Sequence, residues 1–274
     1  AVQRNLIAGN GTGVTLASGG ANEVSNNFIG TAANGVSAVG NVNGIYASSL
    51  SNNIHDNTVS GNLGAAIRIE GANAAANSIS FNRIGLKSLS LCLFPPCAPD
   101  YDALANAGDG MRLANGAAGN NISANDIAWN GGDGISLPDA GPQNAISENS
   151  MHDNGGLGTD LGGNGTNAND NDATAPAGSP NRLLNFPVVA LAGGNTIAGT
   201  AHGYLQSTNG HYTLEFYADD APDPSLHGEG RIRNIHDSEL GSLRAAGYGD
   251  AQRVRYNGFQ WVSPHRTVPG VFLA

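Results

Sequence analysis

The sequence predicts an all-β solenoid, a fold made of stacked coils. Asparagines recur five residues apart, and an apolar residue follows the first asparagine of each pair by two places. The pairs are Asn5–Asn10, Asn57–Asn62, Asn77–Asn82, Asn125–Asn130 and Asn149–Asn154. Residues 121–137 also align with residues 145–161 at an offset of 24, and Asn57 and Asn77 lie 20 apart. A period of about 20–25 residues is typical of solenoids, in which each coil buries its apolar side by stacking on its neighbours.

Each coil is expected to hold three short strands separated by bends. In one repeat an apolar residue alternates with polar ones in residues 121–123, 125–128 and 134–137. Asparagine and glycine separate these segments, and both tolerate the left-handed backbone that a sharp bend requires. Parallel stacking then turns the inward residues into columns and the bend asparagines into hydrogen-bonded ladders. The expected columns are Val24, Ile54, Ile122 and Ile146; Val59, Ile79, Ile127 and Met151; and Ile45, Ile67, Met111 and Ile135.

Changes in pattern divide the chain into three parts. Residues 1–161 carry the repeat, residues 162–185 form a polar linker or cap, and residues 186–274 are expected to form a small antiparallel β module. Alternation in 195–201 and 211–219 supports that module, whereas no regular pattern follows residue 228, which leaves open whether the module is complete. Segments 30–43 and 86–107 interrupt the solenoid period, and such insertions commonly project from one face.

Composition limits the partners of the chain. The net charge is −10 and only 12% of residues are charged, which argues against nucleic acid as a partner. No apolar run approaches the roughly 20 residues that a membrane span requires. The chain opens on Ala1 within the repeat pattern, which indicates a fragment or a mature segment. None of these observations predicts the oligomeric state.

The two cysteines, Cys92 and Cys97, lie in the segment CLFPPC. A disulfide closing this proline-stiffened loop would indicate an oxidising, extracytoplasmic setting. A redox or metal pair and two free thiols are the alternatives, and zinc is disfavoured because no histidine lies nearby.

The repeat motif N-x-I-x-x-N-x-G-x-G-I, with residues 26–45 and 155–189, resembles right-handed parallel β-helix repeat proteins of the pectate-lyase-like superfold. The likeness covers about residues 1–220 and is closest to repeats in large bacterial secreted or surface proteins. It implies an extracellular or cell-surface location and a β-helix followed by a small β-sandwich-like module. It does not imply one activity, because the superfold includes polysaccharide lyases, tailspikes, epimerases and adhesin-like proteins without catalysis.

One outward column is a candidate glycan-binding groove. Aligning the third strand of each coil places five outward residues in a row: Tyr46, Arg68, Arg112, Ser136 and Asp160. Their spacing of about 4.8 Å suits successive units of an extended polysaccharide. Guanidinium groups bind carboxylates through paired hydrogen bonds, and an aromatic ring offers a flat face to a sugar. The alternative is a solvated strand face. The insertion at 86–107 leaves open whether a further coil separates Arg68 from Arg112.

A second set of residues carries the enzyme alternative. Asp109 and Asp133 lie 24 residues apart in G-D-G segments beside the same column. With Asp160 and Arg112 they are the candidate catalytic residues of a polysaccharide lyase or glycoside hydrolase. The bland alternative is that each aspartate caps a bend. The scarcity of lysine, with Lys87 inside an insertion, lowers the lyase hypothesis.

Calcium is the only candidate cofactor. Asp160, Asp170 and Asp172 lie near or within the oxygen-rich segment 167–172, although this segment does not match a calcium-binding loop and a flexible acidic linker is the alternative. The sequence therefore favours a non-catalytic, adhesin-like domain that binds a polysaccharide or cell-surface glycan. A polysaccharide-cleaving enzyme and a structural stalk remain the alternatives.

Overall fold

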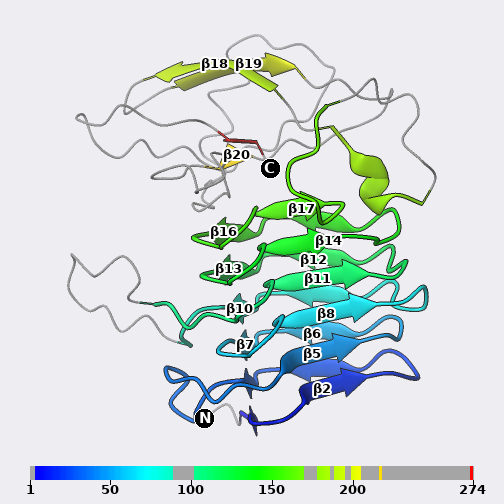
Figure 1. Cartoon of the computed structure of the whole chain (residues 1–274), viewed down its shortest axis with the longest axis vertical. Coiled ribbons are helices and arrows are strands. Elements are labelled where there is room, and N and C mark those ends of the chain that lie inside the picture. The colour runs from blue at the N-terminus through cyan, green and yellow to red at the C-terminus, as the bar shows by residue number, and fades with distance from the viewer. Residues whose placement is uncertain are drawn as a thin grey trace.

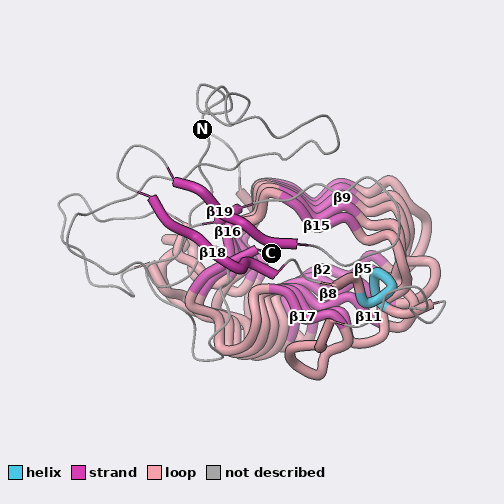
Figure 2. The backbone as a smooth tube through the Cα atoms, turned by 90° about the horizontal axis from the view of Figure 1, so that it is seen from above, coloured by secondary structure: helices cyan, strands magenta, loops and turns pink. Residues whose placement is uncertain are grey.

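The computed structural model describes residues 4–88, 102–169 and 178–185, and the strand residues 188–194, 199–204, 216–217 and 272–273. Within this part the chain winds into a right-handed parallel β-helix whose coils stack along the long axis of the molecule (Figure 1). Seen along that axis, successive coils superimpose, and strands surround the interior on three sides (Figure 2). The predicted solenoid with three strands per coil is confirmed.

Three parallel sheets make up the helix. Sheet 1 contains β3 (Glu23–Ser25), β6 (Asn53–His55), β9 (Ser78–Ser80), β12 (Asn121–Ser123) and β15 (Ala145–Ser147). Sheet 2 contains β1 (Leu6–Ile7), β4 (Phe28–Ile29), β7 (Thr58–Val59), β10 (Arg83–Ile84), β13 (Asp126–Ala128) and β16 (Ser150–His152). Sheet 3 contains β2 (Thr12–Leu16), β5 (Asn43–Ala47), β8 (Ile67–Glu70), β11 (Met111–Ala114), β14 (Ile135–Leu137) and β17 (Thr159–Leu161).

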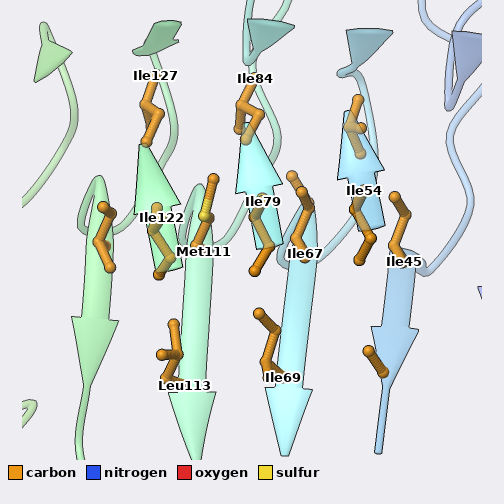
Figure 3. Close-up of a cluster of buried hydrophobic side chains, with 14 of the residues drawn as sticks. Ile45, Ile54, Ile67, Ile69, Ile79, Ile84, Met111, Leu113, Ile122 and Ile127 are labelled. Atoms are coloured by element: carbon orange, nitrogen blue, oxygen red, sulfur yellow. The ribbon is translucent and has the colours of Figure 1, made fainter. Parts of the chain in front are cut away.

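The core consists of aliphatic columns contributed by the three sheets. Figure 3 shows the part of these columns between Ile45 and Ile127. The expected columns are confirmed except for Ile79. Ile79 pairs with Ile54 and Ile122 in sheet 1, whereas the sheet 2 position between Val59 and Ile127 belongs to Ile84. All six of these isoleucine and valine side chains are fully buried.

Asparagine ladders run along the bends between the sheets. In each ladder the backbone N–H and the side-chain amide of one asparagine generally both donate to Oδ1 of the asparagine one coil further on. The first ladder contains Asn22, Asn52, Asn77, Asn120 and Asn144. The second contains Asn5, Asn27, Asn57, Asn82, Asn125 and Asn149. The third contains Asn10, Asn41, Asn62, Asn106, Asn130 and Asn154.

The ladders explain the misplacement of Ile79. A five-residue spacing occurs twice in a coil, from the first ladder to the second and from the second to the third. Asn77–Asn82 is of the former kind and Asn57–Asn62 of the latter, so these two pairs are not equivalent. Along the second ladder the coils are 22, 30, 25, 43 and 24 residues long.

The left-handed residue at most bends is not the asparagine, contrary to expectation. It is the residue just before it, and in many coils this residue is neither glycine nor asparagine, as at Ala76, Phe81 and Ala124 with φ of 54°, 55° and 58°. The left-handed conformation costs a residue with a Cβ about 1–2 kcal/mol. The bend persists because the next asparagine is hydrogen-bonded to the coils on either side of it.

The two long coils carry their insertions at the same place. One follows Ile29 and the other follows Ile84, which occupy equivalent positions two coils apart in sheet 2. The insertions meet across the intervening coil, where the Ser88 N–H donates to the Gly35 carbonyl at 2.8 Å. The described residues of the two insertions therefore lie together at the same bend. The second insertion adds no coil to the helix, since β8 pairs directly with β11.

The solenoid is followed by η1 (Pro180–Leu183), whose Asn181 extends the first ladder by accepting the Asn144 N–H at 2.9 Å. Beyond it, β18 (Val188–Gly194) pairs antiparallel with β19 (Gly199–Tyr204), and β20 (Phe216–Tyr217) with β21 (Phe272–Leu273). The other residues after 217 lie outside the described part. Within the described residues no helix has the length and apolar character that a membrane crossing requires.

Candidate functional site

The register of sheet 3 places the predicted groove residues side by side. Tyr46 pairs with Arg68, Arg68 with Arg112, Arg112 with Ser136, and Ser136 with Asp160. The alignment of the third strands is therefore confirmed, and the question of an intervening coil is settled. We call this row of five residues the sheet 3 column.

Exposure divides the column into two halves. The Arg68 and Arg112 side chains are 33% and 38% exposed, and Tyr46 is partly exposed. Ser136 and Asp160 are only 3% and 4% exposed, so the expectation that all five lie on an open face is wrong for these two. The chain after β17 folds back beside Asp160, where the Gly165 N–H donates to Oδ2 at 2.8 Å. Oδ1 of Asp160 is buried and has no hydrogen-bond partner among the described residues.

Glu70 is a member of this face that the sequence interpretation missed. Its Oε1 accepts hydrogen bonds from Nε and Nη2 of Arg68 at 2.9 and 2.7 Å. Nε of Arg112 lies 3.9 Å from the same oxygen. Glu70 therefore separates two like charges that strand pairing brings together. The alternation of Ile67, Arg68, Ile69 and Glu70 was the available signal, because residues two apart in a strand share a face.

The Arg68 guanidinium also lies over the ring of Tyr46, 5.9 Å from its centroid. Such a contact contributes about 0.5–1 kcal/mol at an exposed site. With Glu70 on one side and Tyr46 on the other, Arg68 is held in one orientation. Tyr46, Arg68 and Glu70 thus form a continuous set of contacts on the exposed half of the column.

Asp109 and Asp133 precede β11 and β14 and bond to the next coil rather than to their own bend. Oδ1 of Asp109 accepts the Asp133 N–H at 3.0 Å, and Oδ1 of Asp133 accepts the Leu157 N–H at 2.8 Å. Asp109 also lies 3.9 Å from Nη1 of Arg112. These contacts give both carboxylates a structural role between neighbouring coils, which differs from the expected capping of their own bends.

Burial and like charge act on both carboxyl groups. Burial is the largest effect on Asp109 and raises its pKa above 3.8. The hydrogen bond from the Asp133 N–H and the charge of Arg112 lower this pKa, whereas the charge of Asp160 raises it. Burial likewise raises the pKa of Asp133, the Leu157 N–H lowers it, and the charges of Asp160 and Asp109 raise it. Asp109, Asp133 and Asp160 therefore lie close enough to repel one another electrostatically.

Replacing Asp133 by asparagine should stabilise the protein near neutral pH. The amide keeps an oxygen for the Leu157 N–H but carries no charge beside Asp109 and Asp160. The pKa of Asp133 is higher in the folded protein than in the unfolded chain, so the folded state favours the protonated carboxyl group. The stability that this proton contributes is fully present below pH 3.8 and is lost as the pH rises through the folded-state pKa. Urea unfolding at both ends of this range should show the advantage of the variant shrinking at acidic pH. A variant less stable than the natural protein at neutral pH would contradict the assignment.

No metal centre is formed within the described residues, where no group of three His, Cys, Asp or Glu side chains is arranged to hold an ion. Of the candidate calcium ligands, Asp160 is engaged by Gly165, and Asp170 and Asp172 lie outside the described residues. Cys92 and Cys97 also lie outside them. Calcium binding and the disulfide therefore stay predictions.

A scan against models of protein families, a search of curated proteins and a search of solved structures each found no match. The fold and the side-chain geometry therefore carry the functional argument for this chain.

Proposed function

We propose that the domain binds an extended glycan along sheet 3, outside the cell or at its surface, without cleaving it. The observation that carries the proposal is the direct pairing of Tyr46, Arg68 and Arg112 on consecutive strands. These strands are spaced by about 4.8 Å on a scaffold locked by three ladders. A polymer lying across the strands would meet the ring of Tyr46 first and then the guanidinium donors of Arg68 and Arg112, which the scaffold holds in place.

Binding is favoured over catalysis by the state of the carboxylates. Oδ1 of Asp109 and of Asp133 each hold a backbone N–H of the next coil, and Asp160 is 4% exposed. A glycosidase requires two carboxyl groups that reach opposite sides of one glycosidic bond. The extracellular location rests on the interpretation of Cys92 and Cys97 as a disulfide.

The proposal predicts selective loss of binding at the exposed half of the column. A panel of neutral, acidic and amino-bearing oligosaccharides on a glycan array should give hits, to be followed by titration calorimetry. Tyr46→Ala and Arg112→Gln should each weaken binding of a hit about tenfold, equivalent to about 1.4 kcal/mol. New reducing ends or unsaturated products on prolonged incubation would instead favour the enzyme alternative.

Matched variants elsewhere on the helix serve as controls. Phe81→Ala removes a 60% exposed aromatic ring at another bend. Arg83→Gln removes an arginine that is 33% exposed and paired with Asp126 at 3.1 Å in sheet 2. Neither should change the affinity. An array without hits, or equal losses in the control variants, would contradict glycan binding on sheet 3.

A further inference from the structure

We infer that Glu70 sets the charge preference of the sheet 3 face, so that the face selects uncharged glycans and rejects acidic ones. The inference rests on the proposed glycan binding and names the substrate class. It reverses the simplest expectation from two outward arginines, which by themselves would favour a uronate polymer.

Arg68 is already engaged by a carboxylate of the protein. Its Nε and Nη2 both donate to Oε1 of Glu70, at 2.9 and 2.7 Å, so one of the two edges of the guanidinium that make paired hydrogen bonds is occupied. The Glu70 side chain is only 9% exposed. A buried carboxylate that lost its partner would be strongly unfavourable, so a sugar carboxylate competing for Arg68 would have to leave Glu70 unpaired.

Arg112 is also close to carboxylates of the protein. Its guanidinium lies between two protein carboxylates, 3.9 Å from Oε1 of Glu70 and 3.9 Å from Oδ2 of Asp109. Neither distance is a close hydrogen bond, so donors remain for an incoming hydroxyl group. The positive charge of Arg112 is nevertheless balanced, which removes the attraction for a distant anion.

The charge of the whole face also opposes the binding of an acidic glycan. Glu70 and Asp109 flank the two guanidinium groups. Asp133 and Asp160 add two further carboxylates beside Asp109 in the following coils. The whole chain also carries a net charge of −10. A polyuronate lying along the strands would add a negative charge with each acidic unit, whereas a neutral polymer would stack on Tyr46 and hydrogen-bond to the remaining donors without repulsion.

The test uses pairs of oligosaccharides that differ only in charge. Galacturonate, glucuronate and mannuronate hexamers are each compared with the carboxyl-reduced, neutral hexamer of the same linkage. For the backbone that binds, the natural protein should hold the neutral member at least about tenfold more tightly, a difference of about 1.4 kcal/mol. Equal affinity, or tighter binding of the uronate, would overturn the inference.

Glu70→Gln is the decisive variant. Glutamine keeps an oxygen that accepts the hydrogen bonds of Arg68, but it removes the counter-charge of Arg68 and one of the two counter-charges of Arg112, which keeps only Asp109. The preference for the neutral hexamer should fall to about threefold or less, or reverse. Glu23→Gln is the matched control, because it removes the same charge from a 64% exposed side chain in sheet 1. An unchanged preference in a folded Glu70→Gln variant would overturn the role of Glu70.

Salt provides a measurement that does not depend on the folding of a variant. Raising sodium chloride from about 0.01 M to about 1 M shortens the Debye length from about 30 Å to about 3 Å. Uronate binding by the natural protein should strengthen as repulsion is screened, and neutral binding should not change. Uronate binding that weakens with salt would show attraction and overturn the inference. If neither member of any pair binds, the proposed function itself fails, which is a different outcome.

Discussion

Replacing Asn125 by alanine should lower the free energy of unfolding by about 3 kcal/mol or more. Oδ1 of Asn125 accepts the N–H and side-chain amide of Asn82, and its own amide donates to Asn149 and to the Ile79 carbonyl. Alanine fills none of these roles, and each buried polar group left without a partner costs about 1–3 kcal/mol. The loss occurs in mid-stack, where both neighbouring coils depend on the same side chain.

The matched control is Asn5→Ala at the start of the same ladder. Asn5 is exposed, and its side-chain amide donates to Oδ1 of Asn27 at 2.8 Å. Water can replace that bond, so the expected loss is about 1 kcal/mol. Urea unfolding followed by far-ultraviolet circular dichroism would measure both variants. Similar losses at the two positions would show that the ladders contribute little beyond filling the bends.

Replacing Gly85 by alanine should destabilise the protein by about 3 kcal/mol or more. Gly85 has a φ of +79°, and a Cβ built there would lie 1.9 Å from the Ala128 carbonyl oxygen. The oxygen belongs to the backbone of β13, so relief requires a strand to move. The expected cost combines about 1–2 kcal/mol for the left-handed conformation with about 1–3 kcal/mol for the steric overlap.

Gly119→Ala separates these two contributions. Gly119 has a φ of +64°, but nothing lies within 4 Å of a Cβ placed there. Alanine occupies the same bend position in other coils, at Ala21 and Ala76, with φ of 55° and 54°. The expected loss is therefore about 1–2 kcal/mol, from the backbone conformation alone. Equal thermal shifts for the two variants would show that the close approach at Gly85 is not limiting.

Much of the architecture could be predicted because a solenoid is governed by short-range repetition. The spacing of asparagines, the alternation of apolar residues and the 24-residue offset are all visible within about two coils of sequence. Once the third strands are aligned, stacking places Tyr46 beside Arg68, whereas the structure was needed to show that no coil separates Arg68 from Arg112. The same alignment could not assign Ile79, since two bends of each coil carry the same five-residue spacing.

The site itself was less predictable, because its chemistry depends on contacts between coils. Nothing in the local sequence of Asp133 shows that its carboxylate receives the Leu157 N–H, 24 residues away. Nor does the pattern around Asp160 show that the following chain covers it and leaves it 4% exposed. Glu70 was visible as an outward residue, but its pairing with Arg68 and its distance from Arg112 required side-chain geometry.

The sequence by itself determined the β-helix, the asparagine ladders and the order of residues along the sheet 3 column, because each coil repeats the pattern of the coil before it. Only the tertiary structure decided which bends stack, which half of the column is open, and that Glu70 balances the two arginines. These properties arise from contacts across coils, and the distance between two coils in space is the same however many residues separate them along the chain.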